Sequence, residues 1–327
     1  MIRGVRIIAI LALSCALSAC VATGSDFADW PAGEAGKLDA TGTVIRHADV
    51  PARNALSRHV DVWLPPDYAT SDARYPVIYV NDGQTLFDPA LSTVSGRDWG
   101  VDEAMTEGIA DGTLPPAIIV GVWSTEARYE EYMIQGAVEP VTDAVRQRLS
   151  TRPKAFDIEA MNGDGYQRFL ADELKPFIDR TYRTEPGRDH TYVMGASTGG
   201  IGALNSVLQR PDVFSASAGL STHVATGQGL VPEYLADNPP DPARVRLYMD
   251  HGDLGVDLDW DYARYQSQID AVMAQAGFTQ ANYDSRVFPG TGHGEAYWSE
   301  RMSLPLAFLL NGSAPDGGVR AMPGKGR

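Results

Sequence analysis

The sequence is poor in cysteine. Its 327 residues include only Cys15 and Cys20, both near the N-terminus. The rest of the chain can therefore form no disulfide, offers no thiol nucleophile and has no cysteine ligands for a metal. Such a chain needs a large apolar core for its stability, and its length is sufficient to bury one.

Positive charge is also scarce. The chain has 27 lysines and arginines against 42 acidic residues, a formal net charge of −15. This balance argues against nucleic acid or an anionic membrane surface as a partner. The chain also contains no H-E-x-x-H motif. We therefore expect neither a metal nor another cofactor.

The N-terminal residues are typical of an export signal. Arg3 and Arg6 precede an apolar run that is too short to span a membrane, and residues 1–19 are predicted to be removed. The end of this segment, "LSAC", resembles the lipobox of bacterial lipoproteins, in which the cysteine becomes the lipidated first residue. This resemblance predicts an exported lipoprotein, periplasmic or anchored to the outer membrane through acyl chains on Cys20. The alternative is an ordinary secretory signal. Removing the segment takes the formal charge to −17, since it holds two arginines and no acidic residue.

The remaining chain predicts one α/β domain between two irregular ends. Residues 20–41 are small and polar, as in a flexible tether, and residues 312–327 are rich in glycine and proline, as in a disordered tail. Between them, over residues 42–311, short apolar runs alternate with amphipathic stretches. This pattern predicts a mostly parallel sheet of eight strands with helices on both faces. Residues 136–164 match neither a strand nor a helix well, and are expected to form a cap or an insertion.

A candidate nucleophile follows one of the apolar runs. In "TYVMGASTGGIGAL", residues 191–204, Ser197 stands in a G-x-S-x-G pattern between a predicted strand and a predicted helix. A serine at such a sharp corner can act as a nucleophile, and the glycines leave room for the backbone to turn. The simpler interpretation is a serine that caps the helix, but it does not account for the surrounding glycines.

His293 is the candidate general base. It lies in the glycine-rich loop "FPGTGHGEAYW", after the last predicted strand, where the carboxyl edge of the sheet also holds the serine turn. His223 and His251 also follow or end strands, and neither is excluded. The acid should precede the histidine in the chain. Four residues of "HGDLGVDLDWDY" compete for this role: Asp253, Asp257, Asp259 and Asp261.

Two backbone N–H groups could bind an oxyanion. The first belongs to Thr198, the residue after the nucleophile. The second is expected in the loop "NDGQTLFD", where Gly83 permits an unusual backbone path and the N–H of Gln84 is the predicted donor.

Taken together, these motifs resemble the esterase D or putative-esterase family of α/β-hydrolases. The similarity extends from about residue 58 to residue 310 and includes the segments "VDVWLPPDY", "YPVIYVNDGQTLFD", "WGVDEAM", "IIVGVWSTEARYEEY", "GDGYQRFLADELKPFIDRTYRT", "GASTGGIGAL", "RPDVFSASAGLS" and "GTGHGEAYWSERM". The resemblance implies a single α/β-hydrolase domain.

The resemblance also implies roles for individual residues. It assigns Ser197 as nucleophile, His293 as base, and Gln84 and Thr198 as oxyanion donors. In relatives, a Leu-Asp pair commonly precedes a Tyr-x-x-Tyr-Gln run, and this spacing selects Asp259 as the acid. Asp257 is the second choice, because the loop is about two residues longer than usual.

Two further residues match a family segment near the substrate cleft, namely Arg128 and Tyr132. The resemblance implies that they contact substrate, and the alternative is a salt bridge and a packed aromatic ring. Two other positions depart from the family pattern: Thr198 replaces a common methionine, and Asn81 replaces a common histidine. Neither removes a group that the chemistry needs.

The implied activity is the hydrolysis of carboxylic esters, with a sugar, aryl or feruloyl-type ester as the expected substrate. Two alternatives keep the same triad: transfer of the acyl group to an alcohol, and cleavage of an enterochelin-like siderophore.

Overall fold

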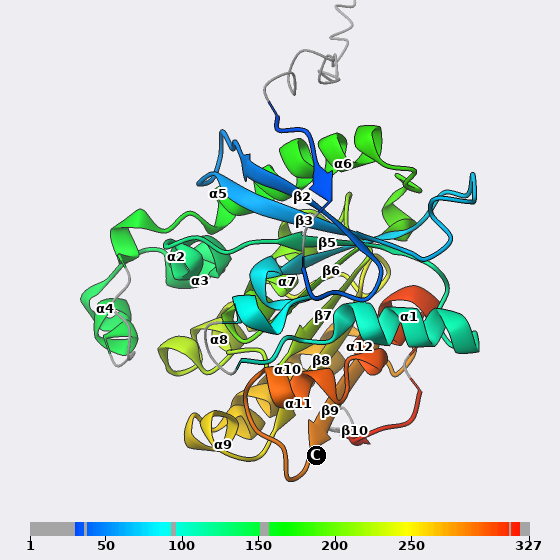
Figure 1. The fold of residues 1–327 in the computed structure, drawn as a ribbon. Helices are drawn as coiled ribbons and strands as arrows, with labels where there is room; N and C mark the ends of the chain where they lie inside the picture. The colour runs from blue at the N-terminus through cyan, green and yellow to red at the C-terminus, as the bar shows by residue number, and fades with distance from the viewer. Residues whose placement is uncertain (1–29, 36–37, 93–95, 151–156, 314, 321–327) are drawn as a thin grey trace, which may run out of the picture. The chain divides into compact units, whose positions relative to one another are not determined.

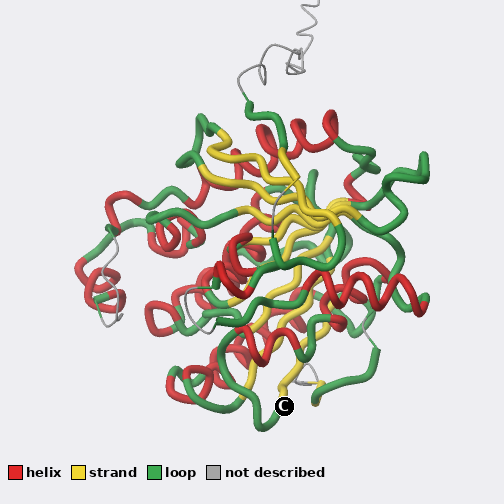
Figure 2. The backbone as a smooth tube through the Cα atoms, in the orientation of Figure 1, coloured by secondary structure: helices red, strands yellow, loops and turns green. Residues whose placement is uncertain are grey.

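The computed structural model describes residues 30–35, 38–92, 96–150, 157–313 and 315–320. The predicted signal peptide and Cys20 lie outside these residues. One mixed β-sheet runs through the unit Pro31–Arg327, and helices cover both of its faces (Figures 1 and 2).

The sheet has ten strands in the order β1-β2-β3-β5-β4-β6-β7-β8-β9-β10. Neighbours from β5 through β4 to β9 pair in parallel, and the pairs β1–β2, β2–β3, β3–β5 and β9–β10 are antiparallel. Eight strands have five or more residues, so the predicted mostly parallel sheet of eight strands is confirmed, with a two-residue strand added at each edge. The strands are β1 (Glu34–Ala35), β2 (Thr43–Val50), β3 (Arg58–Leu64), β4 (Val77–Asn81), β5 (Ile118–Val122), β6 (Thr191–Ala196), β7 (Ala216–Leu220), β8 (Arg246–Gly252), β9 (Tyr283–Phe288) and β10 (Val319–Arg320).

Alternate side chains of the central strands face two helical layers. Ile78 and Val80 of β4 belong to a core shared with α1 and α12, which lie together beside the sheet (Figure 1). Tyr79 points to the opposite face, where its ring packs against Phe214 after α7. The helices are α1 (Val101–Asp111), α2 (Arg128–Tyr132), α3 (Gln135–Val138), α4 (Asp143–Leu149), α5 (Gly163–Arg168), α6 (Lys175–Thr181), α7 (Thr198–Gln209), α8 (Leu230–Asp237), α9 (Val256–Asp259), α10 (Tyr262–Ala276), α11 (Glu295–Ser299) and α12 (Ser303–Asn311).

The predicted helix over "GYQRFLADELKPFIDRTY" is continuous but not uniform. A π-helical segment, Phe169–Leu174, joins α5 to α6. Pro176 explains it, because proline lacks an N–H and its ring collides with the carbonyl one turn earlier, so the preceding turn widens. The expectation for residues 136–164 needs correction, since α4 and most of α3 lie within this segment.

Both ends of the domain extend further than expected. The predicted tether 20–41 includes β1, which pairs with β2, and the Thr41 carbonyl accepts a hydrogen bond from the Trp63 indole. The predicted tail 312–327 includes β10, and the buried Arg286 guanidinium donates to the carbonyls of Pro315 and Gly317. The composition of each end could not predict these contacts, because the residues that the two ends contact lie far away in the sequence. Among the described residues, no helix is both long and apolar enough to cross a membrane.

Candidate active site

Ser197 occupies the tight turn between β6 and α7, as the sequence predicts. Its backbone has φ 56° and ψ −127°, a combination that is strained for any residue other than glycine. The turn is possible because of its glycines: a β-carbon on Gly195 would lie 2.2 Å from the Gly199 carbonyl oxygen. The strained serine directly follows the carboxyl end of β6, as in a nucleophile elbow.

The neighbouring strand ends bring further groups to Ser197. Its N–H donates to the Leu220 carbonyl at 2.9 Å, and its carbonyl accepts from the His223 N–H at 3.0 Å. Between these two contacts lies Ser221, whose hydroxyl donates to Asp257 Oδ2 at 2.9 Å. The end of β7 therefore connects the serine turn to the loop after β8.

Asp257 is the carboxylate that meets His293. The distance from His293 Nδ1 to Asp257 Oδ1 is 2.7 Å, and the Gly252 N–H donates to Asp257 Oδ2, also at 2.7 Å. The first choice from the sequence, Asp259, is wrong: its side chain is exposed, whereas Asp257 is 2% exposed. The second choice has the required geometry.

The backbone of the long acid loop explains this outcome. Gly255 has φ 56° and starts the four-residue helix α9, which turns Asp257 inward and leaves Asp259 at the surface. Asp261 stands at the N-terminus of α10 in a left-handed conformation, and its side chain makes no capping hydrogen bond.

Asp257 is held in its ionised form. Burial opposes the charge, but the hydrogen bond and charge of His293, the Gly252 N–H and the Ser221 hydroxyl outweigh it and lower the pKa of Asp257. A carboxylate can only accept hydrogen bonds, so His293 Nδ1 carries the proton of the shared bond. The other ring nitrogen, Nε2, is then left as the basic one.

Two aromatic rings fix the plane of the His293 imidazole. Tyr262 and Trp298 pack edge-on against it, with centroid distances of 5.8 and 5.1 Å. The rival histidines have other partners: His223 Nδ1 bonds to the Tyr262 hydroxyl, and His251 Nδ1 lies 2.6 Å from the Gly252 carbonyl. In both of these hydrogen bonds the partner of the histidine is not a carboxylate.

The predicted oxyanion loop packs closely against the sheet. A β-carbon on Gly83 would lie 2.3 Å from the Gly121 backbone, so only glycine fits at this position. The Gln84 side chain bonds to Ser124 twice, donating to its hydroxyl at 2.6 Å and accepting from its N–H at 3.1 Å. These contacts fix the backbone on either side of the Gln84 N–H.

Asn81 links the predicted oxyanion loop to α7. Its side-chain amide donates to the Gly199 carbonyl at 2.8 Å and accepts from the Tyr166 hydroxyl at 2.6 Å. A β-carbon on Gly199 would lie 2.6 Å from Asp82 Oδ2, so the two segments are in contact. Asn81, which stands where relatives commonly have a histidine, therefore forms a hydrogen bond between these two segments.

Residues 55–309 match the family model described as putative esterase. The chain belongs to the putative esterase family. This family places the protein among enzymes that hydrolyse carboxylic esters, and the strand order and helical layers described above are those of an α/β-hydrolase esterase.

Known proteins similar to this esterase include one curated relative and two solved structures. Ferri-bacillibactin esterase BesA of Bacillus subtilis (strain 168) is 29% identical over 155 residues, which cover 46% of this chain and 48% of BesA. A ferulic acid esterase structure matches with a TM-score of 0.58 and 21% identity, covering 84% of this chain and 100% of that one. The enterobactin esterase FES from Shigella flexneri matches with a TM-score of 0.60 and 17% identity, covering 85% and 60%.

Arg128 and Tyr132 of this esterase both bond to Asp82, which lies in the predicted oxyanion loop. Arg128 forms a two-pronged ion pair with Asp82, at 2.6 and 2.7 Å, and the Tyr132 hydroxyl accepts from the Asp82 N–H at 3.2 Å. Tyr132 is fully buried, so its predicted contact with substrate is wrong. Burial disfavours the charged guanidinium, but the Asp82 carboxylate outweighs this effect and raises the pKa of Arg128. These contacts match the alternative interpretation, a salt bridge and a packed ring, and the substrate contact of Arg128 stays a prediction.

Replacing Arg128 with glutamine is expected to destabilise this esterase. The Asp82 side chain is 7% exposed and would lose its charged partner, while Arg128 itself is 25% exposed. Breaking a pair of this kind is expected to cost about 2–4 kcal/mol in the free energy of unfolding. The matched control is Arg210→Gln, which breaks contacts to two exposed carboxylates and should cost less than about 1 kcal/mol. Urea denaturation measures both, and equal losses would contradict the prediction.

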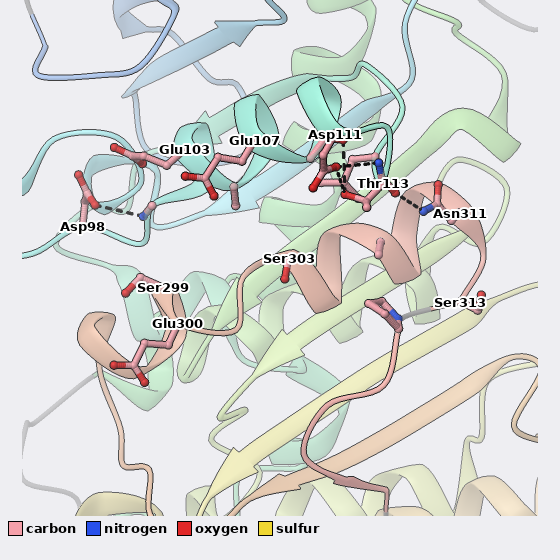
Figure 3. Close-up of a pocket in the computed structure, with 16 residues that line it drawn as sticks. Asp98, Glu103, Glu107, Asp111, Thr113, Ser299, Glu300, Ser303, Asn311 and Ser313 are labelled. Atoms are coloured by element: carbon pink, nitrogen blue, oxygen red, sulfur yellow. Dashed lines mark hydrogen bonds between the residues drawn. The ribbon is translucent and has the colours of Figure 1, made fainter.

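A separate cavity of about 920 Å³ lies between α1 and α12 (Figure 3), and no residue of the candidate triad lines it. Its wall is rich in carboxylates: Asp98, Glu103, Glu107, Asp111 and Glu300. Within the described ranges, no cluster of three or more histidine, cysteine or acidic residues is arranged to hold a metal ion.

Proposed function

We propose that this esterase cleaves its substrates through an acyl-enzyme on Ser197. The contact between His293 Nδ1 and Asp257 Oδ1 supports this mechanism most directly, because it leaves Nε2 as a base at the strand edge that holds the strained serine turn. The residues that form this edge come from the ends of β6, β7, β8 and β9, as expected for an α/β-hydrolase.

The proposed reaction has two halves. In the first, Ser197 attacks the ester carbonyl carbon, His293 takes the serine proton and then gives it to the leaving alcohol, and an acyl-enzyme remains. In the second, His293 takes a proton from water, the hydroxide attacks the acyl group, and the proton returns to Ser197 as the acid leaves. The N–H groups of Thr198 and Gln84 would stabilise the oxyanion, and Asp257 the imidazolium.

Labelling with a fluorophosphonate tests the nucleophile directly. The reagent should add once to the active protein, and peptide mapping should place it on Ser197. The untreated protein supplies the control, and labelling at another serine would contradict the assignment.

A sugar, aryl or feruloyl-type ester remains the expected substrate, and the acid loop favours one that carries an aromatic group. The acid loop carries exposed apolar side chains beside Asp257, with Leu254, Val256 and Leu258 at 44%, 41% and 61% exposure. A ferulic acid esterase among the similar structures supports the same class. A siderophore ester is the second candidate, favoured by the similarity to ferri-bacillibactin esterase and enterobactin esterase. A panel of feruloyl, acetyl-sugar and cyclic catechol esters separates these classes by their kcat/KM values.

We further propose that the protein is exported and anchored through Cys20. The proposal depends on the lipobox-like "LSAC" and the preceding apolar run. Incorporation of labelled palmitate into the wild-type protein, but not into a Cys20→Ala variant, would support it. Equal membrane association of the two proteins would contradict it.

Acidification is expected to lower kcat/KM with a slope of one on logarithmic axes. In the proposed mechanism the general base must be neutral to accept a proton from Ser197, and acid removes the neutral form of an imidazole base. The pKa of Asp257 is lowered below its ordinary value, so this carboxylate stays ionised over the same range and adds no second proton. Initial rates measured from about pH 8 to about pH 5 check this expectation. A flat profile, or a slope of two, would contradict it.

A further inference from the structure

A buried hydrogen-bond network lies behind Asp257, on the side away from His293. Its centre is Ser221, which follows β7 and is fully buried, with φ 38°. The Ser221 hydroxyl oxygen lies 2.9 Å from Asp257 Oδ2, 3.2 Å from Trp298 Nε1 and 3.2 Å from Arg301 Nη2.

The chemistry of these neighbours fixes the direction of each hydrogen bond. An indole N–H and a guanidinium can only donate, so Trp298 and Arg301 occupy the two acceptor sites of the Ser221 hydroxyl. The single proton of the hydroxyl is then left for Asp257 Oδ2. With the Gly252 N–H and His293, Asp257 receives three donors, a pattern that suits a carboxylate and leaves no room for a proton.

A second carboxylate holds Arg301 in place. Asp250 accepts from Arg301 Nη2 at 2.9 Å and from Nε at 3.1 Å, and both side chains are buried. Asp250 also accepts from the Ser221 N–H at 3.1 Å and from the Tyr248 hydroxyl at 2.9 Å. The guanidinium is therefore fixed in orientation, and its charge is shared between two carboxylates, directly with Asp250 and through the hydroxyl with Asp257.

We propose that Ser221 and Arg301 are positioning residues for the catalytic acid. Arg301, held by Asp250, sets the direction of the Ser221 hydroxyl, and the hydroxyl fixes Asp257 as an oriented carboxylate facing His293. The inference rests on the proposed function, since it assumes that Asp257 and His293 serve Ser197. Neither positioning residue touches the reacting atoms, so both act through Asp257.

Loss of this support should lower kcat and leave KM unchanged. Without the Ser221 hydroxyl, Asp257 keeps the bonds to Gly252 and His293 but gains freedom to rotate, and the imidazole loses its fixed orientation. Misplacement of a catalytic group on this scale reduces rates by about 10- to 100-fold. Substrate binding does not involve these buried atoms, so KM should stay within about twofold of the wild-type value.

The test compares Ser221→Ala with Ser206→Ala. Ser206 is the matched control, because it is fully buried in α7 and its hydroxyl lies 2.6 Å from Gln167 Oε1 and 3.1 Å from the Gly202 carbonyl oxygen, with no bond to the triad. Both variants should lose similar thermal stability. Only Ser221→Ala should lose kcat, by about 10- to 100-fold on a p-nitrophenyl ester.

A spectroscopic measurement makes the test independent of substrate. The proton between His293 and Asp257 should give a low-field ¹H resonance that is absent in His293→Gln. This resonance should broaden or shift in Ser221→Ala and stay unchanged in Ser206→Ala. If Ser221→Ala does not fold, Arg301→Lys replaces it, since lysine keeps the charge opposite Asp250 but lacks the planar fork that reaches Ser221.

The outcomes separate two failures. If the wild-type protein cleaves no ester, the proposed function fails, whatever the variants do. If the wild type is active and Ser221→Ala retains kcat within twofold of Ser206→Ala, with an unchanged low-field resonance, the positioning role is overturned and the network is structural only.

Discussion

Replacing Ser197 with alanine should reduce kcat for ester hydrolysis by about 10⁵-fold or more. The proposed mechanism has no other group that can form the acyl-enzyme, and the remaining oxyanion donors give only a small residual rate. The folded state should be kept, because alanine removes the hydroxyl without adding volume, and this hydroxyl makes no hydrogen bond within a helix cap. Hydrolysis of a p-nitrophenyl ester, with circular dichroism as the control for folding, measures the effect.

Substantial turnover by a folded Ser197→Ala protein would exclude the proposed nucleophile. Contamination is the usual source of a false residual rate, so the variant should also be treated with the fluorophosphonate. A protein that retains both activity and labelling has its nucleophile elsewhere.

Replacing Asp257 with asparagine is expected to lower kcat by about 10⁴-fold. The asparagine amide can present an N–H where the carboxylate accepted one, so the His293 proton would move to the other ring nitrogen and the base would be lost. The substitution keeps size and burial, and the Ser221 and Gly252 donors can still bond to the amide oxygen.

Asp259→Asn provides the matched control for this second prediction. Asp259 lies two residues further along α9, but its side chain is exposed. The control should keep kcat within about twofold of the wild-type value, since surface substitutions rarely disturb a distant site. A large loss in Asp259→Asn with little loss in Asp257→Asn would restore the choice that sequence spacing favours.

The places of Ser197 and His293 in the fold could be predicted from the sequence because their signals are local. Ser197 follows a buried strand and is surrounded by glycines that a sharp turn requires, and His293 lies in the loop directly after the last long strand, β9. Both positions follow from the order of strands along the chain of an α/β protein. Short apolar runs and turn residues predict that order well.

The acid could not be chosen in the same way. Asp257 and Asp259 differ by two positions in one loop, and the positive φ of Gly255, where α9 starts, decides which of them turns inward. Spacing relative to relatives favoured Asp259, because that comparison assumes a loop of the usual length. A longer loop changes which residue reaches the histidine without changing the motif around it.

Contacts between distant segments account for the other differences. Tyr132 and Arg128 were expected at the substrate because their segment lies near the cleft, yet both bond to Asp82, which is more than forty residues earlier. The ends of the domain were expected to be irregular because of their composition, but β1 and β10 gain their hydrogen bonds from the sheet edges. The residues around one position in the sequence do not predict which distant segment it will contact.

The hydrogen bonds of Asn81 have a consequence for changing the specificity of this enzyme. Because Asn81 joins the predicted oxyanion loop to α7, a substitution that shifts one of these segments is expected to shift the other. The loop that carries Asp257, residues 253–261, instead exposes three apolar side chains, Leu254, Val256 and Leu258. Libraries for new substrates should therefore vary Leu254, Val256 and Leu258, and leave residues 81–85 unchanged.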